Sequence, residues 1–221
     1  MDVLVLSVLA AAGALTRSVA ISQPDHAPIV GLRRGRSRVD RDLVEQARRG
    51  DREAFAVLVH QVSDVLYAVA FRILRDSGRA EDALQNALVL AWRRLPHLRD
   101  ADRFEAWIHR ILVHACYDES QRTQSWRTNV RVLSLDGPST PDETAAVADR
   151  DELERAYRLL PVEQRAVFVL HHYLGLPLVE VAELLGIPAG TARSRLHYAI
   201  AGLRDALTAD AEPVVQGGRL A

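Results

Sequence analysis

Apolar residues recur at every third or fourth position along most of this chain, and no useful stretch alternates apolar with polar residues. The clearest run begins at Asp51, a residue type that commonly caps helices, and breaks at Asp76-Ser77-Gly78. Its apolar members share one helix face: Phe55, Leu58, Val59, Val62, Leu66, Val69, Ala70 and Ile73. This period predicts an all-α fold.

Residues 39–122 form the first predicted helical block. A short helix over Asp40–Arg49 precedes the long one, and a third helix is expected over Arg79–Leu95, where Pro96 stops it. The sequence Asp102-Arg103-Phe104-Glu105 has capping-box spacing and is expected to open the last helix. Four helices joined by short breaks predict a compact bundle.

A second block, residues 140–209, follows a polar stretch over 123–139 that is read as a flexible linker. Thr140, Pro141 and Glu143 predict a helix start, with that helix running to about Leu159. Another helix is expected from Pro161 to the stop at Gly175. The chain therefore predicts two small helical domains, followed by a tail over 210–221.

A helix-turn-helix is predicted at the end of the second block. Leu178–Leu185 forms a short helix, Gly186-Ile187-Pro188 a tight turn, and a second helix follows. The exposed arc of the second helix is small and polar at its start: Gly190, Thr191, Arg193, Ser194, His197 and Tyr198, with Arg195 on its flank. Such a face suits insertion into a DNA major groove. The alternative is a solvated face on a plain helical hairpin.

The first 38 residues are expected to be a disordered or mis-annotated extension. The apolar run Val3–Leu15 is short for a membrane span, and Asp2 stands where a secretory signal has basic residues. From Gln23 to Arg38 the composition turns to Pro, Gly, His and Arg. We therefore expect no stable membrane insertion.

Composition and motifs argue against an enzyme. The net charge is −1, and all 28 basic residues are arginine. The single cysteine, Cys116, excludes an internal disulfide and fits the reducing cytoplasm. No phosphate-binding glycine loop, His-Glu-x-x-His motif or nucleophile with a plausible base occurs in the sequence. His171 and His172 point about 100° apart on a helix, which favours surface positions over metal ligands. No cofactor or metal is expected.

Five segments together decide among the many classes of helix-turn-helix protein. Gly50–Phe55, Ala80–Arg93, and Phe104–Ile111 with Asp118 resemble region 2 of extracytoplasmic-function (ECF) sigma factors. Leu160–Phe168 and Gly190–Leu196 resemble region 4 of the same family. The resemblance covers about Asp40 to Leu207, and the order and separation of the segments make it specific.

The resemblance implies a cytoplasmic protein that binds bacterial core RNA polymerase and directs promoter-specific initiation by recognising −10 and −35 elements. The third helix would contact polymerase through Glu81, Asp82, Gln85 and Asn86. The loop Pro96–Arg103 and the next helix would hold the unpaired −10 strand, with Arg99, Arg103 and Arg110 as a cationic track. Trp107 could stack on a base of that strand, but its spacing with Ile111 favours a role in the core. Arg193 and Arg195 would read the −35 duplex, with Thr191 and Ser194 nearer phosphates. The linker would cross the polymerase active-site cleft, and an anti-sigma factor would be a further partner.

Two departures from the family pattern affect DNA recognition. His114 stands where the family usually has Asn, which leaves the −10 base preference open. Tyr198, Ile200 and Ala201 occupy a stretch of the recognition helix that is usually basic. Fewer phosphate contacts predict little promoter binding without polymerase.

The alternative to a sigma factor is a free-standing helix-turn-helix transcriptional regulator.

Overall fold

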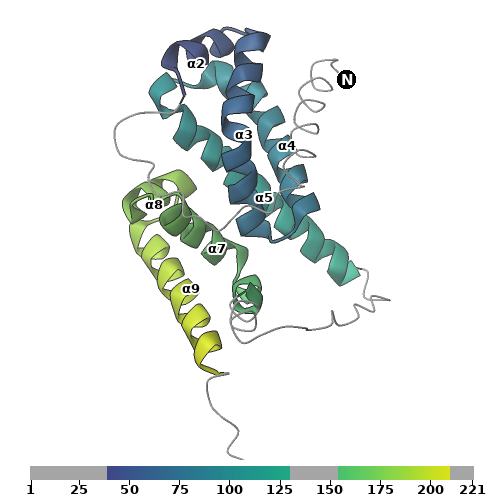
Figure 1. The fold of residues 1–221 in the computed structure, drawn as a ribbon, viewed down its shortest axis with the longest axis vertical. Helices are drawn as coiled ribbons and strands as arrows, with labels where there is room; N and C mark the ends of the chain where they lie inside the picture. The colour runs from purple at the N-terminus through teal and green to yellow at the C-terminus, as the bar shows by residue number, and fades with distance from the viewer. Residues whose placement is uncertain (1–38, 130–153, 210–221) are drawn as a thin grey trace, which may run out of the picture.

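The computed structural model describes residues 39–129 and 154–209, and every regular element in these two ranges is helical (Figure 1). The predicted all-α fold is confirmed. The main helices are α2 (Arg41–Arg48), α3 (Arg52–Leu74), α4 (Ser77–Arg94), α5 (Phe104–Asn129), α7 (Val162–Phe168), α8 (Leu178–Leu185) and α9 (Ala189–Ala209). Two short 3-10 turns, η1 (Leu95–His97) and η2 (Ala101–Arg103), connect α4 to α5, and a π-helical turn, η3 (Val169–Tyr173), extends α7. Residues 154–159 are also helical.

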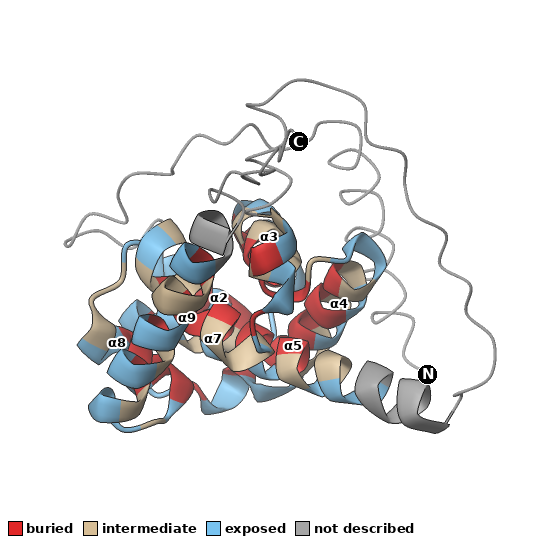
Figure 2. Ribbon diagram, turned by 90° about the horizontal axis from the view of Figure 1, so that it is seen from below, coloured by how far each residue is buried: buried red, intermediate tan, exposed pale blue. Residues whose placement is uncertain are grey.

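Helices α3, α4 and α5 pack side by side as the body of the first block (Figure 1). Their buried faces meet in the interior (Figure 2). The largest fully buried side chains are Phe55, Phe104, Leu58, Leu66, Ile73, Leu84, Leu88, Leu95, Ile108, Leu112, Leu170 and Val44. Helix α3 is long and apolar enough to cross a membrane, but its buried face forms part of the core of this bundle.

Aspartate caps set the helix starts of the first block. As predicted, Asp51 caps α3: its Oδ1 accepts from the backbone N–H groups of Glu53 at 2.9 Å and Ala54 at 3.1 Å. Asp76 accepts from the Arg79 N–H at 2.9 Å. Helix α4 therefore begins at Ser77, before the predicted start at Arg79, because the cap draws Ser77 and Gly78 into the first turn.

Helix α5 differs from the expectation at both ends. The predicted capping box at Asp102 is wrong: Asp100 accepts from the Asp102 N–H at 3.0 Å and starts η2, which continues into α5. The polar composition predicts a linker from residue 123, but α5 continues to Asn129. Neither Pro nor Gly interrupts Phe104–Asn129, so the polar composition after residue 122 does not end the helix.

The second block follows the predicted order. Helix α7 begins after Pro161, passes through η3 and stops before Gly175, whose φ of 70° only glycine adopts without strain. The predicted helix start at Thr140, the extension 1–38 and the tail 210–221 lie outside the described residues.

The two blocks share one hydrophobic core. Buried residues from α3 and α5 are continuous with Val167, Leu170, Val181 and Leu185 from the second block. Figure 2 shows the buried sides of α5, α7 and α8 turned toward one another. We refer to the contact between the helices of residues 39–129 and those of residues 154–209 as the seam.

Candidate nucleic-acid and polymerase interfaces

The turn between α8 and α9 is closed by two backbone hydrogen bonds. Gly186 has a φ of 66°, its N–H donates to Glu183 O at 3.2 Å, and the Ile187 N–H donates to Ala182 O at 3.0 Å. This pair of bonds is a Schellman motif, which caps α8 and turns the chain sharply. The Ala192 N–H then donates to Pro188 O at 3.1 Å and starts α9. The predicted helix-turn-helix is thereby present.

Helix α9 has an apolar and a polar side. Its buried residues are those predicted to anchor it: Ala192, Leu196, Ala199 and Leu203. The predicted reading residues Arg193, Ser194, His197 and Tyr198 are exposed, and Thr191 is half-buried. The Ser194 hydroxyl donates to Gly190 O at 3.0 Å. An exposed N-terminal face with short side chains and one free-standing arginine allows close approach to DNA.

Arg195 lies on the flank of α9 that faces the first block. Burial raises the pKa of the Tyr117 hydroxyl on α5 to about 12, and the positive charge of Arg195 is the largest influence opposing that rise. Arg195 is half-buried, whereas Arg193 is exposed. The structure therefore separates the two arginines predicted to read the −35 element: Arg193 is on the open face, and Arg195 is at the seam.

Arginines and two histidines follow the loop after α4 and one face of α5. Leu98 and Ala101 anchor the loop in the core, while His97, Arg99 and Arg103 are exposed. Arg103, Arg110 and His114 recur at helical spacing, and all three are exposed. The His114 ring lies edge-on to Tyr117, with ring centroids 6.2 Å apart. Trp107 is half-buried beside Phe104, at 5.9 Å between centroids, in keeping with its predicted role in the core.

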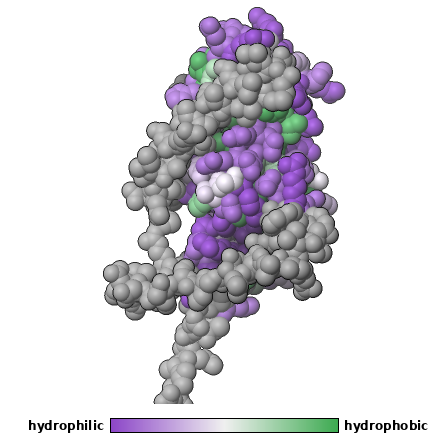
Figure 3. Space-filling view, turned by 90° about the vertical axis from the view of Figure 1, so that its right-hand side faces the viewer, coloured by the Kyte–Doolittle hydropathy of each residue, from purple (hydrophilic) through white to green (hydrophobic). Residues whose placement is uncertain are grey.

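The predicted polymerase-binding residues lie on the side of α4 opposite its buried alanines. Asp82 and Asn86 are exposed, whereas Glu81 and Gln85 are half-buried. Burial, and then the negative charge of Glu81, raise the pKa of Tyr67 on α3, so Glu81 lies on the edge nearest α3. In Figure 3, the described surface on one side of the molecule is mostly hydrophilic, with only small apolar areas.

Two family descriptions match the two blocks. Residues 58–127 match Sigma-70 region 2, and residues 150–201 match Sigma-70, region 4. Among curated proteins, the chain is 34% identical over 178 residues to the ECF RNA polymerase sigma factor SigM of Mycobacterium tuberculosis, covering 80% of this chain and 89% of SigM. This chain belongs to the ECF RNA polymerase sigma factors.

Other relatives and solved structures agree with this assignment. The sigma factor is 26% identical to ECF sigma factor SigW of Bacillus subtilis, covering 74% of this chain and 94% of SigW. The structure of CnrH in complex with the cytosolic domain of CnrY aligns with a TM-score of 0.55 and 28% identity, covering 77% of this chain and 98% of CnrH. The sigma factor RpoE of Bartonella quintana, solved with the anti-sigma factor NepR, shares the fold at a TM-score of 0.57 and 22% identity, over 72% and 99% of the chains. The predicted function as a promoter-directing sigma factor is confirmed.

The seam of this sigma factor is held by polar contacts that the sequence did not reveal. The Arg72 guanidinium lies over the Tyr173 ring, 3.8 Å from its centroid. Arg75 forms an ion pair with Glu154 and lies 5.5 Å from the Tyr157 ring centroid. Burial lowers the pKa of Arg75 and raises that of Tyr157 to about 12. These pairs join residues far apart in the chain, so no local pattern signals them.

Arg75 also has an unusual backbone conformation. It is the one non-glycine residue in the described ranges with positive φ, at 57°, and its N–H ends α3 by donating to Phe71 O at 2.7 Å. A left-handed non-glycine residue costs roughly 1–2 kcal/mol. It persists where surrounding contacts hold it, and here those contacts come from Glu154 and Tyr157 of the second block.

Arg110 approaches the seam from α5. A Cβ atom on Gly186 would lie 3.1 Å from Arg110 Nη2, so the arginine lies against the turn of the helix-turn-helix. Two of the predicted DNA-contacting arginines, Arg110 and Arg195, therefore lie where the blocks meet.

The described residues hold no group of three or more His, Cys, Asp or Glu side chains arranged to bind a metal. Cys116 is fully buried, and burial raises the pKa of its thiol to about 12. The thiolate that a nucleophile requires is thus disfavoured at neutral pH. His171 Nδ1 lies 2.8 Å from Leu176 O, and the His172 ring is tilted against the Phe168 ring, with 4.6 Å between centroids.

Proposed function

We propose that this sigma factor reads the −35 duplex with the N-terminal face of α9, led by Arg193. The supporting observation is the two-sided character of α9: its apolar stripe is buried, while Arg193 and its small polar neighbours are exposed. An arginine on such a face can donate two hydrogen bonds to a guanine edge or one to a phosphate. Thr191 and Ser194 would lie nearer phosphates, with His197 and Tyr198 further along the groove.

The test compares Arg193→Ala with Arg52→Ala, an exposed arginine on α3, in holoenzyme binding to a promoter duplex at several salt concentrations. A lost guanine contact weakens binding by about fivefold to 150-fold at every salt concentration, which corresponds to about 1–3 kcal/mol per bidentate pair. A lost phosphate contact lowers the slope of log K against log salt by about 0.9. If both variants bind like the parent chain, Arg193 does not contact the −35 element.

The −10 strand is proposed to bind along the loop 96–103 and the exposed face of α5. Arg99, Arg103 and Arg110 would follow the backbone of the unpaired strand, and His114 would lie beside a base. The double substitution Arg99→Ala, Arg103→Ala is expected to weaken holoenzyme binding to a single-stranded −10 oligonucleotide and to leave −35 duplex binding unchanged. Equal losses on both probes would point to misfolding instead.

Core polymerase is proposed to bind the polar side of α4, through Glu81, Asp82, Gln85 and Asn86. The exposed carboxylate of Asp82 offers the cleanest substitution. Asp82→Arg is expected to weaken association with core polymerase, because it reverses a charge in the contact. The same reversal at the exposed Asp64 on α3 is the control, and equal effects of the two would place the contact elsewhere.

The remaining assignments complete the proposal: a cytoplasmic protein without enzymatic activity, controlled by an anti-sigma factor. CnrH was solved with the cytosolic domain of CnrY, which supports a partner of this kind here. The units proposed from the sequence are residues 39–122 for −10 and polymerase binding and residues 140–209 for −35 binding. An anti-sigma factor from the host is expected to compete with core polymerase for this chain. Simultaneous binding of both would contradict that role.

A further inference from the structure

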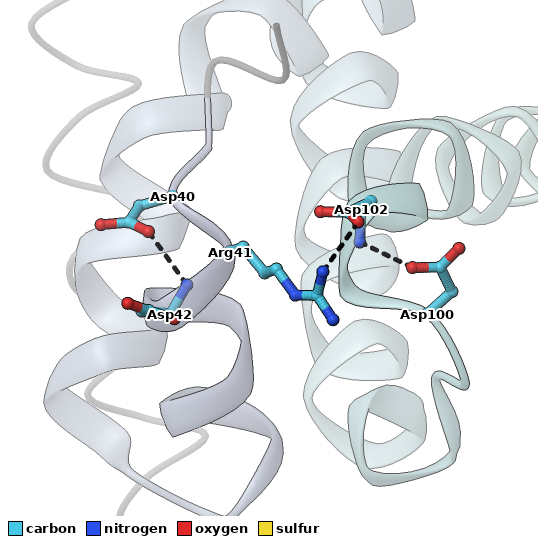
Figure 4. Close-up of polar contacts among 5 residues, drawn as sticks. All are labelled: Asp40, Arg41, Asp42, Asp100 and Asp102. Carbon is cyan, nitrogen blue, oxygen red and sulfur yellow. Dashed lines mark hydrogen bonds and ion pairs between the residues drawn. The ribbon is translucent and has the colours of Figure 1, made fainter.

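Helix α2 contacts the loop between α4 and α5 at two points. The Arg48 Nη1 donates to the carbonyl oxygen of Leu98 at 3.0 Å. The Arg41 side chain reaches from the start of α2 to Asp102, at 3.2 Å between Nη1 and Oδ2 (Figure 4). Arg41, Glu45 and Arg48 recur at helical spacing, so one face of α2 lies against this loop.

The loop has its own internal order between these two anchors. The Leu98 N–H donates to Leu95 O at 3.0 Å, and the Arg103 N–H donates to Asp100 O at 3.1 Å. Asp100 also receives the Asp102 N–H, as Figure 4 shows. Leu98 and Ala101 point into the core, which leaves Arg99 and Asp100 on the outer side of the loop.

The two anchors differ in strength. The side chains of Arg41 and Asp102 are 63% and 60% exposed, so water and salt screen their ion pair, which contributes little. Arg48 and Glu45 are only 31% and 22% exposed, and their ion pair at 2.9 Å fixes the guanidinium that holds Leu98. A charge-assisted hydrogen bond from a half-buried arginine is the stronger restraint. Arg48 is therefore the main external support of the loop.

We infer that Arg48 is a positioning residue for promoter opening: from α2 it holds the Leu98 carbonyl and keeps the loop 96–103 in the shape that receives the unpaired −10 strand. This inference rests on the proposed role of that loop. A loop already ordered before binding avoids the entropy cost of being ordered by the DNA. Arg48 itself lies behind the loop and acts only through Leu98.

The experiment uses the full chain with Arg48→Met, which keeps the aliphatic stem but removes the donors, and Arg48→Lys, which keeps one charged donor. Arg49→Met, at the exposed neighbouring position, is the control. Hydrogen exchange of the free chain measures how fast the backbone amide protons of Leu98, Asp102 and Arg103 exchange, and so how often the loop opens. Holoenzyme affinity is measured for a single-stranded −10 oligonucleotide and for a −35 duplex, both from a promoter identified by run-off transcription.

Arg48→Met is expected to speed exchange at these amides and to weaken −10 binding by about threefold to tenfold, as loss of roughly one hydrogen bond implies. The affinity of Arg48→Met for the −35 duplex is expected to stay unchanged. Arg48→Lys is expected to keep most of the −10 affinity, and Arg49→Met is expected to behave like the parent chain. Unchanged exchange, unchanged −10 affinity, equal losses on both DNA probes, or no rescue by lysine would each overturn the inference. A different result would separate the two proposals: the parent holoenzyme does not bind the −10 strand, but Arg48→Met still speeds exchange. The proposed −10 role of the loop would then be wrong, whereas Arg48 would still hold the loop in place.

Discussion

At the scale of single residues, His109 is a buried titratable group on α5. Its Nδ1 lies 2.7 Å from the carbonyl oxygen of Glu105, which can only accept, so Nδ1 carries the proton of the neutral ring. Its Nε2 is buried and has no hydrogen-bond partner among the described groups. Burial lowers the pKa of His109, and the bond to Glu105 opposes this only in part.

This lowered pKa predicts a loss of stability in mild acid. Below about pH 6.5 the unfolded chain takes up a proton at His109 that the folded chain refuses, so unfolding becomes easier as pH falls. The loss per pH unit approaches about 1.4 kcal/mol only well below pH 6.5, where the unfolded ring is fully protonated, and only while the folded ring stays neutral. Urea unfolding between pH 7.5 and 5.5 is the measurement.

His109→Gln is expected to flatten that pH dependence, because glutamine can still donate to Glu105 but does not titrate. His172→Gln, at an exposed ring, is the control and is expected to flatten it less. If the pH dependence of His109→Gln equals that of the parent chain, His109 is not the group responsible.

At the scale of elements, two glycines lie near the start of α9 and differ in whether an alanine could replace them. Gly186 lies three residues before the start of α9, and Gly190 lies one residue after it. Gly186 has a φ of 66°, and a Cβ there would crowd Arg110 at 3.1 Å. Gly190 is helical, and a Cβ there would have no atom within 4 Å. The first glycine therefore serves the turn, whereas the second is compatible with alanine in the free protein.

Gly186→Ala is expected to lower the free energy of unfolding by roughly 1–2 kcal/mol, from the left-handed backbone alone. Gly190→Ala is expected to leave stability unchanged or to raise it by up to about 1 kcal/mol. It is expected to weaken −35 binding, since the added methyl group keeps α9 away from the DNA. Unfolding and duplex-binding measurements on both variants check this, and unimpaired −35 binding by Gly190→Ala would contradict the proposed approach of α9.

Local chemistry explains which elements could be predicted. Asp51, Gly175 and Gly186 each act within a few residues of themselves, and their caps and turns appear where the sequence indicates. Asp102 shows the limit: its spacing fits a capping box, but Asp100 accepts the Asp102 N–H and starts the η2 turn that leads into α5. The end of α5 at Asn129 was missed because polar composition resembles a linker even where nothing breaks the helix.

At the scale of the whole molecule, the seam limits the exposure of one candidate DNA contact and positions another. Arg193 and Arg99 are exposed, Arg110 is exposed but lies against the Gly186 turn, and Arg195 is half-buried beside Tyr117. Each of these residues could be nominated from the sequence. Their separation could not, because it depends on how two blocks pack across contacts such as Arg72–Tyr173 and Arg75–Glu154.

Tyr173→Leu is expected to loosen the seam, because it keeps an apolar side chain but removes the ring under Arg72, a contact contributing about 0.5–2 kcal/mol. Fluorophores on cysteines introduced at the exposed positions Gln61 and Glu183 would report the distance between the blocks. The buried Cys116 thiol, with its pKa raised to about 12, is expected to stay unlabelled. Tyr173→Leu should shift the free chain toward longer distances, and the control Tyr198→Leu, on the exposed face of α9, should not. Identical distance distributions for Tyr173→Leu and the parent chain would show that the Arg72–Tyr173 contact does not hold the seam.

Run-off transcription shows whether this chain directs transcription by reading promoter DNA with both blocks. Purified protein is added to sigma-free bacterial core polymerase with fragmented genomic DNA from the host. Discrete transcripts are expected that require both components and weaken strongly with Arg193→Ala, on the exposed face of α9. No transcripts and no association with core polymerase, together with specific DNA binding by the chain alone, would contradict this function.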